Sequence, residues 1–353
     1  MITGLLMVID IPDERGLSEI DIRYGNPLKC HFPLFNWMAP LPLEYMGILY
    51  FIMWIGAAGI CLGYKFKLSC IMFTVPYWYI FLLDKTTWNN HSYLFGLISI
   101  LFTFSSAHHA FSVDSRLDPS IRNKPVPMWN YAIIRFQFFL LYFYAGVKKF
   151  DLDWIGGHSM TRLSMHWVFD PFRLVLNDEQ IDFWIIHIFG FLFDLTVGFF
   201  LLISKTRPIA IFFSSAFHLM NSRIFHIGQF PYVCLCMTPI FCSYDWPDRL
   251  INWFKKTPQK PEVTSENKRN KTPVSGGLTL FLLLSYVATQ LFLPFSHFIT
   301  KGYNNWTNGL YGYSWDMMVH NWDSVLTVIK VVDNDSGEEF FIDPEVGITA
   351  LAI

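Results

Sequence analysis

The sequence predicts an all-α polytopic membrane protein from its composition, its long apolar segments and the distribution of basic residues between them. Of 353 residues, 53% are hydrophobic and only 15% are charged, whereas soluble globular chains carry about 25% charged residues. A soluble chain of this size cannot hide that much apolar surface, and such a composition excludes intrinsic disorder. A formal net charge of −2 argues against a nucleic-acid partner, which would require a basic patch.

The chain begins with an apolar segment that is too short to cross a membrane. Residues 1–9 are followed by charged residues and by no small-residue cleavage site, so they do not match a secretory signal peptide. We expect residues 1–44 to form a partial helix, whose beginning this chain lacks, and a loop on the non-cytosolic side.

A bundle of about eight transmembrane helices is expected over residues 45–298. A membrane helix needs about 20 mostly apolar residues, and several of the candidates are shorter, so we expect some helices to be tilted or only partly embedded. The candidate spans are residues 45–62, 68–83, 92–107, 129–147, 183–204, 208–221, 226–242 and 276–298.

Basic residues concentrate in alternate connections between these spans. Lysine and arginine occur near residues 65–67, 116–124 and 205–207, and the stretch 253–273 is the most basic of the chain. The positive-inside rule assigns these four connections to the cytosol. The opposite side then receives residues 84–90, 148–181 and 221–225, and everything after residue 298.

The C-terminal segment has the pattern of a β-hairpin. Two β-like apolar runs, 325–332 and 339–342, are separated by the turn sequence Asp335-Ser336-Gly337. The chain stops on another apolar run. We therefore interpret 299–353 as the short, incomplete start of a β-rich domain on the non-cytosolic side.

This topology brings polar groups from distant segments to one face of the membrane. Ionisable groups near the membrane interior are costly and tend to mark function. Each group also has a structural explanation: lysines at a helix end snorkel to the headgroups, histidines bond between helices, and aromatic residues form an interfacial belt. The groups are Trp88, Asn90 and His91, the pair Lys148-Lys149, His218 with Asn221, and the run 311–315.

The lysine pair has a specific chemical use. Burial disfavours an ammonium ion, and a second cation alongside disfavours it further. We therefore expect an uncharged amine at this pair, which would act as a general base near pH 7, with a neighbouring histidine tuning or relaying the proton. These residues favour a proton-abstracting enzyme and leave its substrate open.

Other polar residues give weaker indications. Asp194 and His187 are seven residues apart in one span and so share a helix face. Two interpretations are open for them: a proton relay or, as the preferred one, structural contacts between helices. The six cysteines show no zinc spacing, and no metal site is expected. Cys30, in a non-cytosolic loop, is a disulfide candidate, and Asn305 and Asn334 are glycosylation candidates.

Three segments resemble the vitamin K-dependent gamma-carboxylase family. They are residues 82–93 (LLDKTTWNNHSY), 145–149 (AGVKK) and 302–320 (GYNNWTNGLYGYSWDMMVH). The resemblance implies an integral enzyme of the endoplasmic reticulum membrane whose active site faces the lumen. Such a lyase converts glutamate to gamma-carboxyglutamate in secretory proteins that carry a propeptide. It consumes vitamin K hydroquinone, O2 and CO2, and a vitamin K cycle reductase is expected in the same membrane.

The resemblance also implies roles for individual residues. Lys149 matches the base that deprotonates the hydroquinone, His91 a histidine that supports this chemistry and His218 a second one. Positions that match the quinone and glutamate site are Asn90, Trp88, Tyr311 and Trp315.

The chain departs from the family pattern at both ends. We expect it to lack the family's N-terminal cytosolic segment and part of the first span, and to lack most of the lumenal domain that binds the propeptide. The disulfide partner of Cys30 would lie in that missing part. A second hypothesis is therefore a catalytically impaired membrane protein that binds quinone or a partner carboxylase. Turnover of a small glutamate-containing peptide would separate the two.

Overall fold

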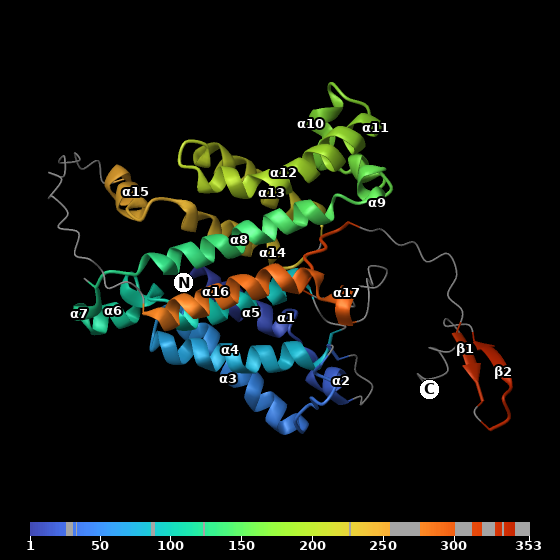
Figure 1. The fold of residues 1–353 in the computed structure, drawn as a ribbon, viewed down its shortest axis with the longest axis horizontal. Coiled ribbons are helices and arrows are strands. Elements are labelled where there is room, and N and C mark those ends of the chain that lie inside the picture. The colour runs from blue at the N-terminus through green and yellow to red at the C-terminus, as the bar shows by residue number, and fades with distance from the viewer. Residues whose placement is uncertain are drawn as a thin grey trace.

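The computed structural model describes residues 1–25, 31–32, 34–85, 89–122, 124–225, 227–254, 276–300, 313–319, 329–333 and 335–342. These residues form a mainly helical molecule with a small two-stranded sheet (Figure 1). The elements up to the middle of the chain are α1 (Ile2–Asp13), η1 (Leu17–Glu19), α2 (Ile20–Gly25), α3 (Leu43–Leu62), α4 (Phe66–Leu83), α5 (Asn90–Phe104), η2 (Ala107–His109), α6 (Val113–Leu117), α7 (Pro119–Arg122), α8 (Met128–Lys148) and α9 (Leu152–Ile155).

The second half continues the helical pattern before the strands. Its elements are η3 (Leu163–Met165), η4 (Trp167–Phe169), α10 (Asp170–Arg173), α11 (Asp178–Gln180), the π-helix η5 (Ile181–Phe189), α12 (Gly190–Leu202), α13 (Arg207–Ile224), α14 (Phe230–Met237), η6 (Thr238–Phe241), α15 (Trp246–Phe254), α16 (Gly277–Phe292), η7 (Leu293–Phe295), α17 (His297–Thr300), β1 (Ile329–Val332) and β2 (Glu339–Ile342).

The predicted membrane character is confirmed, but the count of eight spans is not. Within the described residues, four helical stretches are long and apolar enough to cross a membrane: α3, α4, the continuous Asp178–Leu202 and Gly277–Phe295. Two more apolar stretches, α5 and Phe230–Phe241, are shorter. The other two predicted spans correspond to α8 and α13, which carry more polar residues along their length.

Local sequence explains where key helices begin and end. The helix α3 ends at Gly63, whose φ of 64° lies in the left-handed region that glycine adopts without strain. The helix α5 begins at a capping box, in which the Asn89 side chain accepts from the Ser92 backbone N–H and the Ser92 hydroxyl bonds back to the Asn89 backbone N–H. These bonds satisfy amides that the first helical turn leaves free. They also place His91 in the first turn of α5.

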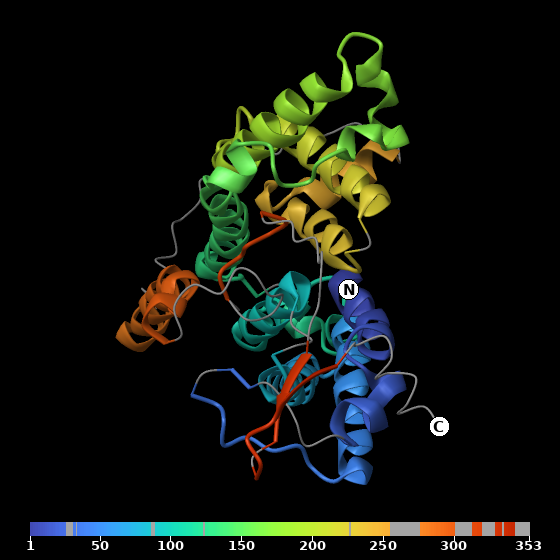
Figure 2. The same cartoon turned by 90° about the vertical axis from the view of Figure 1, so that its right-hand side faces the viewer.

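The helices pack in two groups. In one, α3 packs against α1 and α4, and α4 against α5; in the other, α12 packs against α8 and α13, and α13 against α14. Contacts of α1 and α5 with α14 join the two groups. Figure 2 shows both groups, with α16 at the edge. Only 11% of the apolar stretch that contains α16 is buried, as expected for a helix that faces lipid.

Glycine lets the central helices α8 and α12 approach closely. A Cβ added to Gly146 of α8 would lie 2.4 Å from the backbone nitrogen of Leu195 in α12. Where small residues lie at an interface, helix backbones can come together. The last residues of α8 are thereby held against the middle of α12, next to Asp194.

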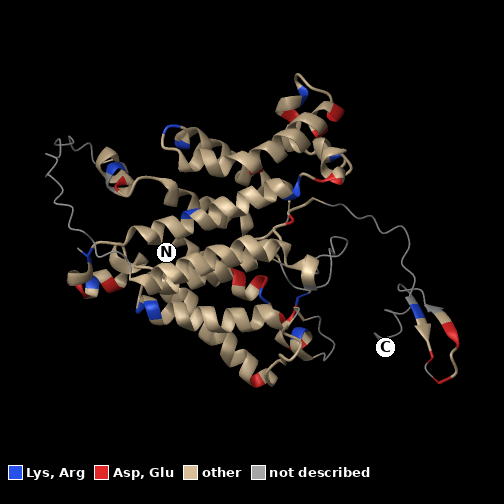
Figure 3. Ribbon diagram, viewed as in Figure 1, with Lys and Arg blue, Asp and Glu red and all other residues tan. Residues whose placement is uncertain are grey.

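Charged residues are sparse along the long helices and more frequent at their ends and in the connections (Figure 3). The connections that contain α6, α7 and α15 lie at one end of the bundle, and those that contain α9, α10 and α17 lie at the other (Figure 1). This arrangement agrees with the alternation of connections predicted from the sequence.

The predicted hairpin is present. β1 and β2 pair antiparallel, with Ile329 opposite Ile342 and Val332 opposite Glu339. Gly337, with a φ of 72°, lies in the turn.

We expect Gly146→Ala to lower the stability of the protein by about 1–3 kcal/mol, because the added methyl group forces α8 away from the backbone of α12. The measurement is thermal unfolding of the purified protein in detergent. Gly47→Ala in α3 is the matched control, because nothing lies within 4 Å of its added Cβ, and alanine there favours the helix by up to about 1 kcal/mol. Equal unfolding temperatures for the two variants would contradict the close approach of α8 and α12.

Candidate functional site

A cavity of about 1000 Å³ collects most of the sequence-predicted site residues that the structure describes. Asn90 and His91 enter from the start of α5, Lys149 from the end of α8, and His218 from α13. Asp194 of α12 also lines the cavity, as do Met317 and Met318 of the 313–319 segment. Much of the remaining lining is aromatic or aliphatic: Leu141, Phe169, Ile185, Ile186, Phe189, Phe212, Phe213, Phe217, Ile224 and Phe230.

Lys149 is buried and paired with a carboxylate. Its Nζ lies 2.5 Å from Oδ2 of Asp194, and the two residues are only 6% and 4% exposed. The indole of Trp154 lies beside the same amine, with its ring centroid 4.9 Å away. A buried charge in such apolar surroundings requires this kind of partner.

The prediction of an uncharged lysine amine takes no account of nearby carboxylates. It relied on burial and on repulsion from Lys148, but Lys148 has its own carboxylate, Asp316, at 3.5 Å. Each lysine is thus paired with a separate acid, and the mutual repulsion of the two cations is compensated. Asp194 is a partner of Lys149 that the sequence did not predict.

The predicted link between Asp194 and His187 is absent. The His187 ring instead bonds the carbonyl oxygens of Asp182, at 2.5 Å, and Ser159, at 2.7 Å. Residues 181–189 form a π-helix, so the α-helical spacing that placed both side chains on one face does not apply. His187 therefore contacts backbone carbonyls, one in its own helical stretch and one in the connection that contains Ser159. The sequence indication for Asp194 was its charge within a span.

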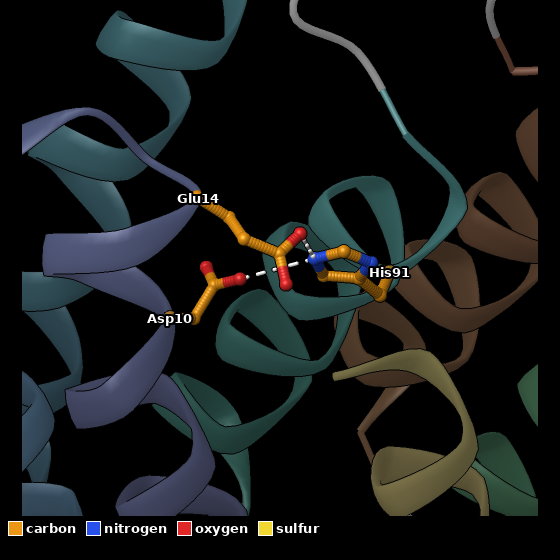
Figure 4. Close-up of side chains that lie close together, drawn as sticks. All are labelled: Asp10, Glu14 and His91. Atoms are coloured by element: carbon orange, nitrogen blue, oxygen red, sulfur yellow. Dashed lines mark hydrogen bonds and ion pairs between the residues drawn. The ribbon is translucent and has the colours of Figure 1, made fainter. Parts of the chain in front are cut away.

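His91 lies between two carboxylates of the N-terminal segment (Figure 4). Its Nε2 is 3.0 Å from Oδ1 of Asp10 and 2.6 Å from Oε2 of Glu14. Nε of the buried Arg15 lies 3.3 Å from Oδ2 of Asp10. The sequence predicted no site at these charges; the signal for one is the spacing of Asp10 and Glu14, which are four residues apart and therefore share a helix face.

The electrostatics of this cluster favour ionisation of the Glu14 carboxyl group. Burial opposes the ionisation of Glu14, but the hydrogen bond and charge of His91, together with the charge of Arg15, lower its pKa below the usual value. Asp10, Glu14 and His91 also have the donor atoms of a metal site, all within 4.8 Å of one another. In this structure each of the two carboxylates already has a basic partner, His91 or Arg15, so these contacts do not depend on a metal ion.

Two buried polar atoms at the cavity have no hydrogen-bond partner within the described part of the chain. One is Nδ1 of His218 and the other is Oδ1 of Asn90. The second ring nitrogen of His218 is held by the hydroxyl of Tyr142 at 2.6 Å. Buried polar atoms without a partner are costly, so these two atoms are available to a bound molecule with polar groups.

The remaining predicted site residues are not placed in the cavity. Trp315 is buried with its ring centroid 5.0 Å from that of Tyr93, and it is not among the lining residues. The other predicted residues lie outside the described part of the chain: Trp88, Tyr311, Cys30, Asn305 and Asn334. Within the described part, the five other cysteines are free thiols.

We expect Asp10→Ala to destabilise the protein by about 3 kcal/mol or more, because it leaves buried positive charge unpaired. The control is Glu19→Ala, which removes a carboxylate that pairs with Arg23 but is 54% exposed, and which should cost no more than about 1 kcal/mol. Thermal unfolding in detergent measures both. Similar unfolding temperatures for the two variants would show that the cluster contributes no more than a surface pair.

Two protein families match the chain. The HTTM domain matches residues 1–246, and the vitamin K-dependent gamma-carboxylase lumenal domain matches residues 276–352. No solved structure matches the chain. Because the first match spans well over half of its residues, the chain belongs to the HTTM domain family, and together the matches make it a gamma-carboxylase-like protein. The second family implies a vitamin K cofactor and vitamin K-dependent substrate proteins.

Proposed function

We propose that this gamma-carboxylase-like member of the HTTM domain family converts peptidyl glutamate to gamma-carboxyglutamate and oxidises vitamin K hydroquinone to its epoxide. The observation that carries the proposal is one cavity in which Asn90 and His91 of α5, Lys149 at the end of α8 and His218 of α13 meet. The same four residues match family positions in the sequence.

The cavity suits vitamin K hydroquinone, which is a co-substrate with an apolar body and two hydroxyl groups. Aromatic walls would bury the rings, while the unpartnered Nδ1 of His218 and Oδ1 of Asn90 would bond the hydroxyl groups. Phe212 and Phe213 line the cavity and are also 67% and 48% exposed. Part of the cavity wall thus reaches the outer surface of α13, where a lipid-soluble molecule would enter from the membrane.

In this proposal the bound hydroquinone, once deprotonated, reacts with O2 to give the strong base that removes the glutamate γ proton before CO2 is captured. The protein supplies the first deprotonation at Lys149, whose amine lies on the cavity wall beside Trp154. His91, held between Asp10 and Glu14, supports the site from the opposite group of helices. The apolar walls exclude water that would quench a strong base.

The wider setting belongs to the same proposal. Residues 45–298 form the membrane catalytic bundle in the endoplasmic reticulum, the cavity faces the lumen, and residues 299–353 begin the lumenal domain. The protein substrates are secretory proteins with a propeptide, and a vitamin K cycle reductase regenerates the hydroquinone. Asn305 and Asn334 are the proposed glycosylation sites, and Cys30 is the proposed disulfide cysteine.

We expect Lys149→Ala to reduce carboxylation and epoxide formation together by about 100-fold or more, because general-base catalysis contributes about 10²–10⁴-fold. The assay uses reduced vitamin K and a glutamate-containing pentapeptide with the full chain. Lys205→Ala, at an exposed position between α12 and α13, is the control and should retain both activities. Epoxide formation that persists in Lys149→Ala would refute the role of the lysine. A wild-type protein that binds the quinone without turnover would refute the enzyme itself.

A further inference from the structure

The contact between Lys149 and Asp194 determines whether the lysine amine can accept a proton. At 2.5 Å from a carboxylate, the amine of Lys149 has the partner of an ammonium ion. An ammonium ion carries three donors and no acceptor, so it cannot take a further proton from a bound molecule. A base at this position must first transfer its own proton elsewhere.

We propose that Asp194 is the final acceptor of the hydroquinone proton and that Lys149 relays it, an inference that rests on the function proposed above. In one step the hydroxyl O–H bond of the hydroquinone breaks and an N–H bond forms on Lys149, while another N–H bond of Lys149 breaks and an O–H bond forms on Oδ2 of Asp194. No oxidant or reductant takes part. The products are a neutral carboxylic acid, an ammonium ion and the hydroquinone anion.

This route keeps the net charge of the buried site constant. Before the transfer, the ammonium of Lys149 is balanced by the carboxylate of Asp194; afterwards, the same ammonium balances the new anion. An isolated charge is expensive in apolar surroundings, and both residues line the cavity. The acid therefore stores the proton, and the lysine remains the counter-ion of the deprotonated molecule.

Other ionisable groups near Asp194 either have different hydrogen-bond partners or are poor proton acceptors. Tyr142 of α8 and Cys234 of α14 lie close enough to interact electrostatically with Asp194, but in their neutral forms they offer protons more readily than they take them. Nε2 of His218 of α13 is hydrogen-bonded to the Tyr142 hydroxyl at 2.6 Å, and its Nδ1 is the nitrogen that would bond a hydroxyl group of the hydroquinone.

The other charged neighbours of the relay are also engaged. Lys148 is paired with Asp316 at 3.5 Å, and His187 on the preceding turns bonds backbone carbonyls. Among the described residues, Asp194 is the carboxylate within hydrogen-bond distance of the Lys149 amine.

The first test is the pH dependence of epoxide formation. In the wild type, activity persists in acid as long as Asp194 is ionised. In Asp194→Asn, Lys149 must first lose its own proton to water, so we expect the acid limb of the pH–rate profile to move up by about one pH unit or more. Asp194→Glu restores a carboxylate and should return the limb toward the wild-type position.

The matched control is Asp182→Asn. Asp182 lies on the same helical stretch, and its carboxylate accepts hydrogen bonds from the backbone N–H and the hydroxyl of Ser164, but it does not line the cavity. The acid limb of the pH–rate profile of Asp182→Asn should coincide with that of the wild type. An acid limb that is unchanged in Asp194→Asn would overturn the proposal.

The second test does not depend on turnover. Reduced vitamin K is added without O2, and the infrared difference spectrum is recorded for the carboxylic-acid C=O band that protonation of Asp194 creates. We expect the band in the wild type and in Asp182→Asn, its loss in Asp194→Asn, and a changed frequency in Asp194→Glu. The glutamate variant keeps the test decisive if the asparagine variant does not fold, because a band of unchanged frequency would assign the proton to another group.

Failure of this inference is distinct from failure of the proposed function. In one outcome, the wild type forms epoxide and carboxylates the peptide while the infrared band is the same in the wild type and in both variants at position 194. That result would support the proposed function and refute the relay. A wild-type protein without either product would lose the function itself.

Discussion

Pairing of buried charge is the constraint on which the rest of this structure depends. Lys149, Asp10, Arg15 and Asp194 are each at most 6% exposed, in a bundle whose surroundings are largely apolar. Removing such groups from water costs several kcal/mol for each ion unless an opposite charge lies nearby. The helices therefore have to assemble so that each of these charges meets its partner, and both clusters lie at the wall of one cavity.

The two clusters differ in what they can do. The group around His91 draws two carboxylates from the N-terminal segment and one imidazole from α5, with Arg15 behind them, so each carboxylate has a basic partner. The pair of Lys149 and Asp194 is balanced in charge, but a single proton transfer between the two residues converts it to a neutral amine and a neutral acid. The second cluster is suited to move a proton, and the first to hold a side chain in place.

Helix geometry decides whether the pair of Lys149 and Asp194 forms at all. Gly146 lets the backbones of α8 and α12 approach, and Lys149 follows at the next turn, opposite Asp194. The π-helix at 181–189 rotates the preceding residues, so that His187 turns to the backbone of neighbouring segments instead of to Asp194. Small local features of the chain therefore determine which acid the lysine meets.

The sequence by itself determined the membrane class, the helical segments, the C-terminal hairpin and four of the residues that meet in the cavity: Asn90, His91, Lys149 and His218. These features follow from local composition, from periodicity and from short motifs. The partners of Lys149 and His91 were decided only by the tertiary structure, because Asp194 and Asp10 are far away along the chain and become neighbours through helix packing. The number of spans was also out of reach, since polar residues along α8 and α13 make their hydropathy ambiguous.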